Sequence, residues 1–220
     1  MKALLSAHDI CKSFSLEHQK IEVLKSINLS VFEAEFVAIM GKSGSGKSTL
    51  ISILAGLDSP DSGTVILHDD DLTQLTEEQL ALKRQQEISF VFQTFHLIPT
   101  LTVEENIGFP LKISRSFQQN KVDELLNKVQ LNHRANSFPH QLSGGEKQRT
   151  AIARALITQP SVLFADEPTG NLDEKNASSI LELLIDLQKQ FNTSLIVVTH
   201  DPGIAKRADR IIRIVDGRLA

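Results

Sequence analysis

Short apolar runs alternate with helical patterns along most of the chain. A run of four to six apolar residues predicts a buried strand, and apolar positions that recur every three or four residues predict a helix. Buried strands are expected at residues 35–40, 88–92, 162–165, 194–198 and 211–215. Helices are expected at residues 48–56, 76–86, 102–110, 120–130 and 174–190. This alternation is typical of an α/β fold whose sheet is mostly parallel.

Two regions depart from the alternation. Residues 21–24, 27–31 and 64–67 form short alternating runs separated by turn residues, which predicts an N-terminal antiparallel β subdomain. From Thr94 onward the strand signals stop, and an α-helical lobe of approximately residues 94–155 is expected to be inserted in the α/β core. We therefore expect residues 1–220 to form a single domain.

The composition narrows the class of protein without defining it. The net charge is −4 and no basic tract occurs, so nothing supports nucleic-acid binding. No run of roughly 18 apolar residues is present, so no membrane-spanning helix is expected, and the N-terminus lacks the pattern of a signal peptide. Cys11 is the only cysteine, which excludes an internal disulfide and is typical of a reducing cytosol. The 11 Phe residues must supply any aromatic stacking, because Trp and Tyr are absent.

The strongest motif is a phosphate-binding loop. Gly41-Lys-Ser-Gly-Ser-Gly-Lys-Ser48 has the form G-x-x-x-x-G-K-S and lies between a predicted strand and a predicted helix, which is the context this motif requires. Its glycines let backbone N–H groups turn toward phosphate oxygens. Lys47 places a cation at the β- and γ-phosphates, and the Ser48 hydroxyl can bind Mg²⁺. The residues expected to hold the nucleotide are Gly41, Ser43, Gly44, Ser45, Gly46, Lys47, Ser48 and Thr49.

A second candidate phosphate site begins at Leu142-Ser-Gly-Gly-Glu146. Ser143 and Glu146 form a capping box, which many helices carry for stability alone. Gly144 and Gly145, however, are poor helix formers, and they make sense where another molecule must approach the backbone closely. Two phosphate sites of different design in one chain suggest two half-sites, each completed by another copy of the protein.

Polar residues follow four of the predicted strands, at the sheet edge where ligands of α/β proteins bind. The phosphate loop follows residues 35–40, and Gln93 follows residues 88–92. Asp166 suits a Mg²⁺ site, since Mg²⁺ takes few protein carboxylates, and Glu167 suits the group that polarises the attacking water. His200 can donate a hydrogen bond to a γ-phosphate. Phe14 fits either stacking on adenine or a place in the core.

In this order the motifs resemble those of the ATP-binding subunit of an ABC transporter, and the resemblance covers nearly the whole chain. It implies a P-loop NTPase core that binds ATP and Mg²⁺. Glu167, His200 and Gln93 would be catalytic, Ser48, Gln93 and Asp166 would hold the metal, and Phe14 would stack on the base. It further implies an ATP-bound homodimer in which each ATP contacts the loop of one copy and the signature of the other. The residues implied to contact nucleotide at that second site are Ser143, Gly144, Gly145, Glu146 and Asp173.

The stretch Asp166–Asp173, the stretch Phe92–Pro99 and Arg134-Ala-Asn136 resemble the lipoprotein-release and macrolide-export branch of that family. The resemblance implies separate integral membrane permease subunits. Residues 94–111 directly follow Gln93 and are rich in apolar side chains, so they are expected either to form the docking surface for those subunits or to form the core of the helical lobe. These side chains are Phe95, Leu97, Ile98, Leu101 and Phe109. The resemblance also implies a cytoplasmic protein, peripheral on the inner membrane. Two positions depart from the family pattern: Phe14 stands where Tyr is usual, and Ala34 stands where Gly is common.

Other classes of nucleotide-binding protein fit the sequence less well. Asn120-Lys-Val-Asp123 matches the guanine-reading motif of small GTPases, but it falls within a helical pattern, and no D-x-x-G motif occurs, so Asn120 is interpreted as a helix cap. A DNA-maintenance ATPase would need a long coiled-coil insertion, and a translation factor would usually carry two cassettes. The remaining alternative is an ATP-dependent regulator of a cell-envelope or division machine, which acts through a membrane partner without transport.

Overall fold

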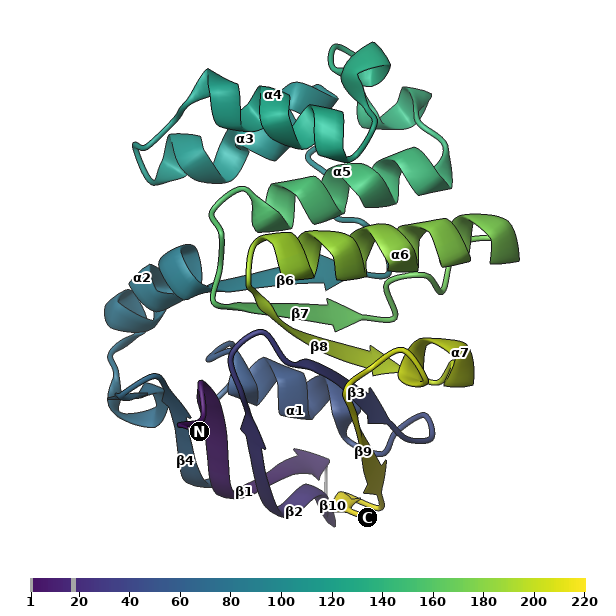
Figure 1. The fold of residues 1–220 in the computed structure, drawn as a ribbon. Coiled ribbons are helices and arrows are strands. Elements are labelled where there is room, and N and C mark those ends of the chain that lie inside the picture. The colour runs from purple at the N-terminus through teal and green to yellow at the C-terminus, as the bar shows by residue number, and fades with distance from the viewer. Residues whose placement is uncertain (1, 17–18) are drawn as a thin grey trace. The chain divides into compact units, whose positions relative to one another are not determined.

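The computed structural model describes residues 2–16 and 19–220, and the chain divides into two compact units (Figure 1). Unit 1 comprises residues 1–84 and 194–220, and unit 2 comprises residues 85–193. Within the described residues, no helix is long and apolar enough to cross a membrane.

Unit 1 contains an antiparallel sheet in the order β2-β1-β4-β5. Its strands are β1 (Leu5–Leu16), β2 (Gln19–Val31), β4 (Ser62–Leu67) and β5 (Asp70–Asp71). The sequence predicted two short strands where β2 is one, and it did not predict β1. The alternating pattern is broken by β-bulges where β1 pairs with β2, and Asp9 and Ser26 adopt positive φ angles there. Because a bulge adds a residue to one strand, it shifts the period of two that sequence reading relies on.

The parallel strands of unit 1 are β3 (Phe36–Met40), β8 (Ser194–Thr199) and β9 (Arg210–Val215), and β10 (Arg218–Leu219) adds an antiparallel edge. β3 lies between β8 and β9, with Met40 opposite Thr199 on one side and Arg213 on the other. β8 is buried along its whole length, as expected for a strand covered on both faces. The helices of this unit are α1 (Lys47–Leu54) and α7 (Pro202–Ala205), with a 3₁₀ turn, η1, at Leu72–Gln74.

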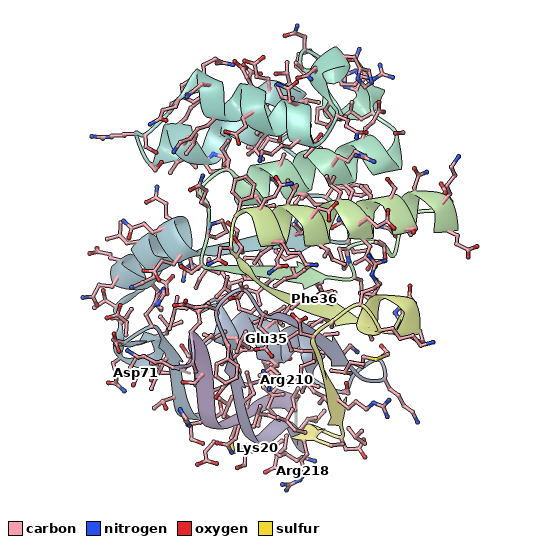
Figure 2. The ribbon with its side chains drawn as sticks, viewed as in Figure 1. Lys20, Glu35, Phe36, Asp71, Arg210 and Arg218 are labelled. Carbon is pink, nitrogen blue, oxygen red and sulfur yellow. The ribbon has the colours of Figure 1, made fainter. Side chains whose placement is uncertain are left out.

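The turn that leads into β3 is held by charged groups. Glu35 accepts a hydrogen bond from the Phe32 N–H at 2.8 Å, and the Arg210 Nε donates to the other oxygen of the same carboxylate at 2.8 Å. Figure 2 shows Glu35, Phe36 and Arg210 at this junction of unit 1. Ala34 in the turn has φ +56°, the left-handed conformation that glycine adopts most readily. The turn therefore forms without the usual glycine.

Unit 2 combines two parallel strands with a layer of helices. The strands are β6 (Ile88–Phe92) and β7 (Val162–Asp166), paired so that Phe92 lies opposite Asp166. Helix α2 (Glu77–Glu87) begins at a capping box formed by Thr76 and Gln79. The remaining helices are α3 (Val103–Ile113), α4 (Gln119–Lys128), α5 (Gly144–Leu156) and α6 (Glu174–Gln190), with 3₁₀ turns η2 at Asn132–Arg134 and η3 at Pro139–Gln141.

Residues 94–155 are helical or irregular throughout, as the sequence predicted, and α3, α4 and α5 pack together there (Figure 1). The buried side chains of α3 include Val103, Ile107 and Leu111. The interpretation of Asn120 as a helix cap was wrong: Gln118 is the N-cap of α4, and Asn120 lies inside the first turn. A guanine-reading loop is equally absent at this position, because Asn120 and Asp123 are both helical.

Candidate nucleotide and signature sites

In unit 1 the phosphate loop follows β3 directly and ends at α1. Gly44 and Gly46 have φ angles of +76° and +100°. A Cβ on Gly46 would lie 2.8 Å from the Val23 carbonyl oxygen, and one on Gly41 would lie 2.5 Å from the Ile214 carbonyl oxygen. Only glycine fits both positions, so the compact loop depends on the motif's own spacing.

The loop carries two polar groups suited to an anion. The Lys47 ammonium donates to the carbonyl oxygens of Gly41 and Lys42, each at 2.9 Å, and these bonds hold its charge over the loop. The Ser45 hydroxyl is buried, and among the described residues it has no hydrogen-bond partner. A buried polar group without a partner costs stability unless a ligand satisfies it. Together with the N-terminus of α1, these groups fit the phosphates of a nucleotide.

His200 belongs to the same edge of unit 1 as the loop. β3 and β8 are parallel and in register, so residues that follow Met40 and Thr199 emerge at the same edge. Asp201, one residue further, caps α7 by accepting a hydrogen bond from the Gly203 N–H. The order of the strands within unit 1 therefore brings the phosphate loop and His200 to the same edge of the sheet.

Phe14 is 43% exposed, so it does not belong to the core. The Lys12 ammonium lies 5.4 Å from the centre of its ring and is itself held by Asp58 at 2.8 Å. An exposed ring beside a fixed cation is available for stacking on a planar group. Cys11, Lys20, Lys25, Asp61 and Arg218 contribute to a pocket of about 340 Å³ in unit 1, but neither Phe14 nor the phosphate loop lines it.

In unit 2 the end of β6 and the end of β7 lie side by side. Phe92 and Asp166 are paired across the two strands, and they are followed by Gln93 and Glu167 respectively. Glu167 has φ +45°, a strained conformation for a residue that is not glycine, and such strain concentrates at functional sites. The Gln93 Nε2 donates a hydrogen bond to the Asn171 side-chain oxygen at 3.2 Å. The amide oxygen of Gln93 and the carboxylate of Asp166 are of the kinds that can bind Mg²⁺.

The signature residues begin helix α5. Ser143 is the N-cap and forms the predicted capping box with Glu146. A Cβ on Gly144 would lie 3.2 Å from Leu172, and one on Gly145 would lie 3.3 Å from Asn176, so part of the need for glycine comes from packing within this chain. Gln148 in the same helix donates to the Pro168 carbonyl oxygen at 2.6 Å. These contacts attach the signature helix to the segment after β7.

Asp173 caps α6. Hydrogen bonds from the backbone N–H and the side chain of Asn176 hold the pKa of Asp173 below its ordinary value, so its carboxylate is ionised at neutral pH. Arg134 and Asn171 lie in the stretches that carry the family resemblance, and the structure gives each a contact with a site residue: Arg134 with Glu146 and Asn171 with Gln93. Sequence reading could not assign these pairs, since the partners lie 12 and 78 positions apart.

The motifs of the two units together define a P-loop ATPase of the cassette type. The profile of the ABC transporter family matches residues 24–170. The chain belongs to this family, and it is an ATP-binding and ATP-hydrolysing subunit of an ABC transporter.

Similar proteins support the same assignment. The chain is 44% identical to the lipoprotein-releasing system ATP-binding protein LolD of Acinetobacter baylyi, over 98% of this chain and 96% of that protein. It is 47% identical to the uncharacterized ABC transporter ATP-binding protein YvrO of Bacillus subtilis, over 98% and 95%. It also resembles dimeric MJ0796, an ATP-binding cassette solved in a post-hydrolysis state with ADP and Pi, with a TM-score of 0.88, 38% identity, and coverage of 98% and 96%. The predicted fold class is thereby confirmed.

Proposed function

We propose that this chain binds ATP with Mg²⁺ and hydrolyses it as a homodimer, to drive a separate pair of integral membrane subunits. Phe14 stacks on the base. The phosphates are held by the residues of the loop: Gly41, Ser43, Gly44, Ser45, Gly46, Lys47, Ser48 and Thr49. Ser48, Gln93 and Asp166 would hold Mg²⁺, which would offset the charge of the phosphates. Glu167 orients and deprotonates the attacking water, and His200 donates to the γ-phosphate.

The composite site is the central part of this proposal. Ser143 is exposed at the N-terminus of the 13-residue helix α5, and two glycines form the first turn. Exposed first-turn N–H groups at a helix N-terminus favour an anion. We propose that Ser143, Gly144, Gly145 and Glu146 contact the phosphates of an ATP held by the loop of a second copy, and that Asp173 lies at the same interface. The similarity to dimeric MJ0796 supports this assembly.

ATP-driven dimerisation tests the composite site. In the Glu167→Gln variant, which should retain ATP, nucleotide should convert monomer to dimer, as measured by light scattering. Adding Ser143→Arg should prevent the dimer while the monomer still binds a fluorescent ATP analogue. Lys47→Ala is the comparison variant, because it should weaken nucleotide binding itself. A Ser143→Arg variant that dimerises like its parent would rule out the composite arrangement.

The membrane partner docks, in this proposal, on residues 94–111 of unit 2. This apolar patch consists of Phe95, Leu97, Ile98, Leu101 and Phe109, all of which are half-buried. The lobe's core is made instead by buried residues such as Val103 and Ile107, so the patch is available to a partner. The similarity to LolD supports lipoprotein release, or the related macrolide export, as the process that is driven. The chain would then act on the cytoplasmic face of the inner membrane, within one ABC ATPase domain of residues 1–220.

A further inference from the structure

The Glu146 carboxylate at the start of α5 is shared between the signature serine and an arginine. One oxygen, Oε2, accepts hydrogen bonds from the Ser143 N–H and the Ser143 hydroxyl, both at 2.8 Å. The other oxygen, Oε1, accepts from the Arg134 Nε at 2.9 Å. The side chain of Glu146 is 19% exposed, and that of Arg134 is 40% exposed. The two oxygens are therefore divided between the two partners, at a position that solvent reaches.

This carboxylate is charged. Burial raises the pKa of Glu146, but the hydrogen bonds from Ser143 and Arg134 outweigh burial and hold the pKa below its ordinary value. A negative charge in the first turn of α5 lies where the phosphates of a partner's ATP would approach, and like charges repel. The Ser143 hydroxyl, moreover, has a single proton, which it can donate either to Glu146 or to a phosphate oxygen.

We propose that Arg134 is a positioning residue of the composite ATP site: it neutralises Glu146, so that the start of α5 accepts the phosphates of an ATP held by a second copy. The inference rests on the composite site proposed above. His133 lies on the same side, with its Nε2 3.8 Å from Glu146 Oε1, and adds to the positive charge when it is protonated. Without Arg134, the repulsion acts directly on the phosphates, and Ser143 is held more firmly by the carboxylate.

The rival role for Arg134 is to hold the backbone before the signature. That backbone has its own hydrogen bonds, from the Arg134 N–H to the Leu131 carbonyl oxygen at 2.8 Å and from the Ser137 N–H to the Arg134 carbonyl oxygen at 2.8 Å. Both survive a change of the side chain. Substitution of the Arg134 side chain therefore tests its charge pair with Glu146, while the 3₁₀ turn η2 should be retained.

A double-mutant cycle separates the two roles. In the Glu167→Gln background, the ATP concentration for half-maximal dimerisation is measured by light scattering for the parent, Arg134→Gln, Glu146→Gln and the double variant. Arg134→Gln should raise this concentration about tenfold when Glu146 is present, and should change it little in the Glu146→Gln background. The defect should shrink as salt rises, since the screening length falls from about 10 Å at 0.1 M to about 3 Å at 1 M.

Two controls complete the experiment. Arg115→Gln removes the same charge from an exposed position of unit 2 and should behave like the parent. Arg134→Lys keeps the charge and should retain most of the ATP-driven dimerisation. This holds even if Arg134→Gln lowers the melting temperature of the protein. The inference is overturned if Arg134→Gln has no effect, or if it has an equal effect with and without Glu146. Failure of the parent itself to dimerise with ATP would instead overturn the composite site.

Discussion

Gln93 and Asn171 are joined by two hydrogen bonds that link the residue after β6 to the segment after β7. The Gln93 Nε2 donates to the Asn171 Oδ1 at 3.2 Å, and the Asn171 Nδ2 donates to the Gln93 carbonyl oxygen at 2.9 Å. Gly170 leaves room for this pair, since a Cβ there would lie 2.8 Å from the Gln93 Nε2. The 170–171 segment thus sets the position of both the side chain and the backbone of Gln93.

The first prediction concerns Asn171→Ala. Loss of both hydrogen bonds should let Gln93 leave the orientation needed for hydrolysis. At about 0.5–1.5 kcal/mol for each bond, kcat should fall roughly tenfold. Steady-state ATPase assays measure this change. Asn127→Ala is the control, because it removes two local side-chain bonds, one to the Asp123 carbonyl oxygen and one from the Asn132 amide, and should leave kcat unaltered. An Asn171→Ala variant with the parent's kcat would show that the pair does not hold Gln93 for catalysis.

The second prediction concerns Glu167→Gln. The substitution keeps the shape of the side chain but removes the carboxylate that acts on water, so turnover should fall by ~10²–10⁴-fold. ATP binding should persist, because the loop in unit 1 is unchanged. Phosphate release and binding of a labelled ATP analogue measure the two effects. Turnover within a few-fold of the parent would remove Glu167 from this role.

The third prediction concerns the exposed ring of Phe14. Phe14→Ala should weaken nucleotide binding by roughly 1–3 kcal/mol if the ring stacks on adenine. Stacking reads no pattern of donors and acceptors, so GTP should compete well with ATP. Phe14→Tyr is the conservative control and should bind like the parent. Unchanged affinity of the Ala variant in a fluorescence titration would assign Phe14 to the surface alone.

The fourth prediction concerns the stability of the turn before β3. Ala34 has φ +56°, and this conformation is less costly for glycine than for alanine. Ala34→Gly should therefore raise the free energy of unfolding by about 1 kcal/mol. Ala177→Gly, inside helix α6, should lower it by roughly 0.5–1 kcal/mol, since glycine has more freedom to lose there. Urea denaturation gives both values. If Ala34→Gly lowers the free energy of unfolding instead, the positive φ angle of Ala34 is not a source of strain.

Several elements could be predicted because their signals are local. Strand β7 and helix α6 lie within one residue of the expected limits, since an uninterrupted apolar run marks the strand and a helical apolar pattern marks the helix. Strand β1 was missed because its sequence, Leu5–Leu16, mixes polar and apolar residues and owes its conformation to pairing with β2 and β4. Tertiary pairing of this kind is not visible in a single segment.

The candidate site likewise combines local motifs, which could be predicted, with contacts between distant residues, which could not. The phosphate loop and the capping box of Ser143 are local motifs and were predicted in place. The contacts that orient their neighbours come from distant residues, such as the Arg134 guanidinium on Glu146. Asn106 is a further example: it is buried, and its amide bonds the backbone of Ile98 and Leu101, although its sequence context marks only a helix.

That contact bears on the proposed docking surface, because it holds the backbone of Ile98 and Leu101. Asn106 accepts a hydrogen bond from the Ile98 N–H at 2.8 Å and donates to the Ile98 and Leu101 carbonyl oxygens at 3.1 and 2.9 Å. Arg154 from α5 donates to the carbonyl oxygens of His96 and Phe95 at 2.7 and 3.0 Å. Phe95 and His96 both have positive φ angles, so the segment is held in a defined and strained conformation.

The last prediction is that this segment binds a short cytoplasmic helix of the membrane subunit. Leu97→Glu or Ile98→Glu should abolish co-purification with that subunit and also transport, because a carboxylate would be buried in an apolar contact. Soluble ATPase activity should persist, since both side chains are half-buried and outside the lobe's core. Ile113→Glu, at a position 58% exposed near the end of α3, is the matched control and should retain binding. If Leu97→Glu binds the membrane subunit normally, or if it unfolds the isolated chain, residues 94–111 are not the docking surface.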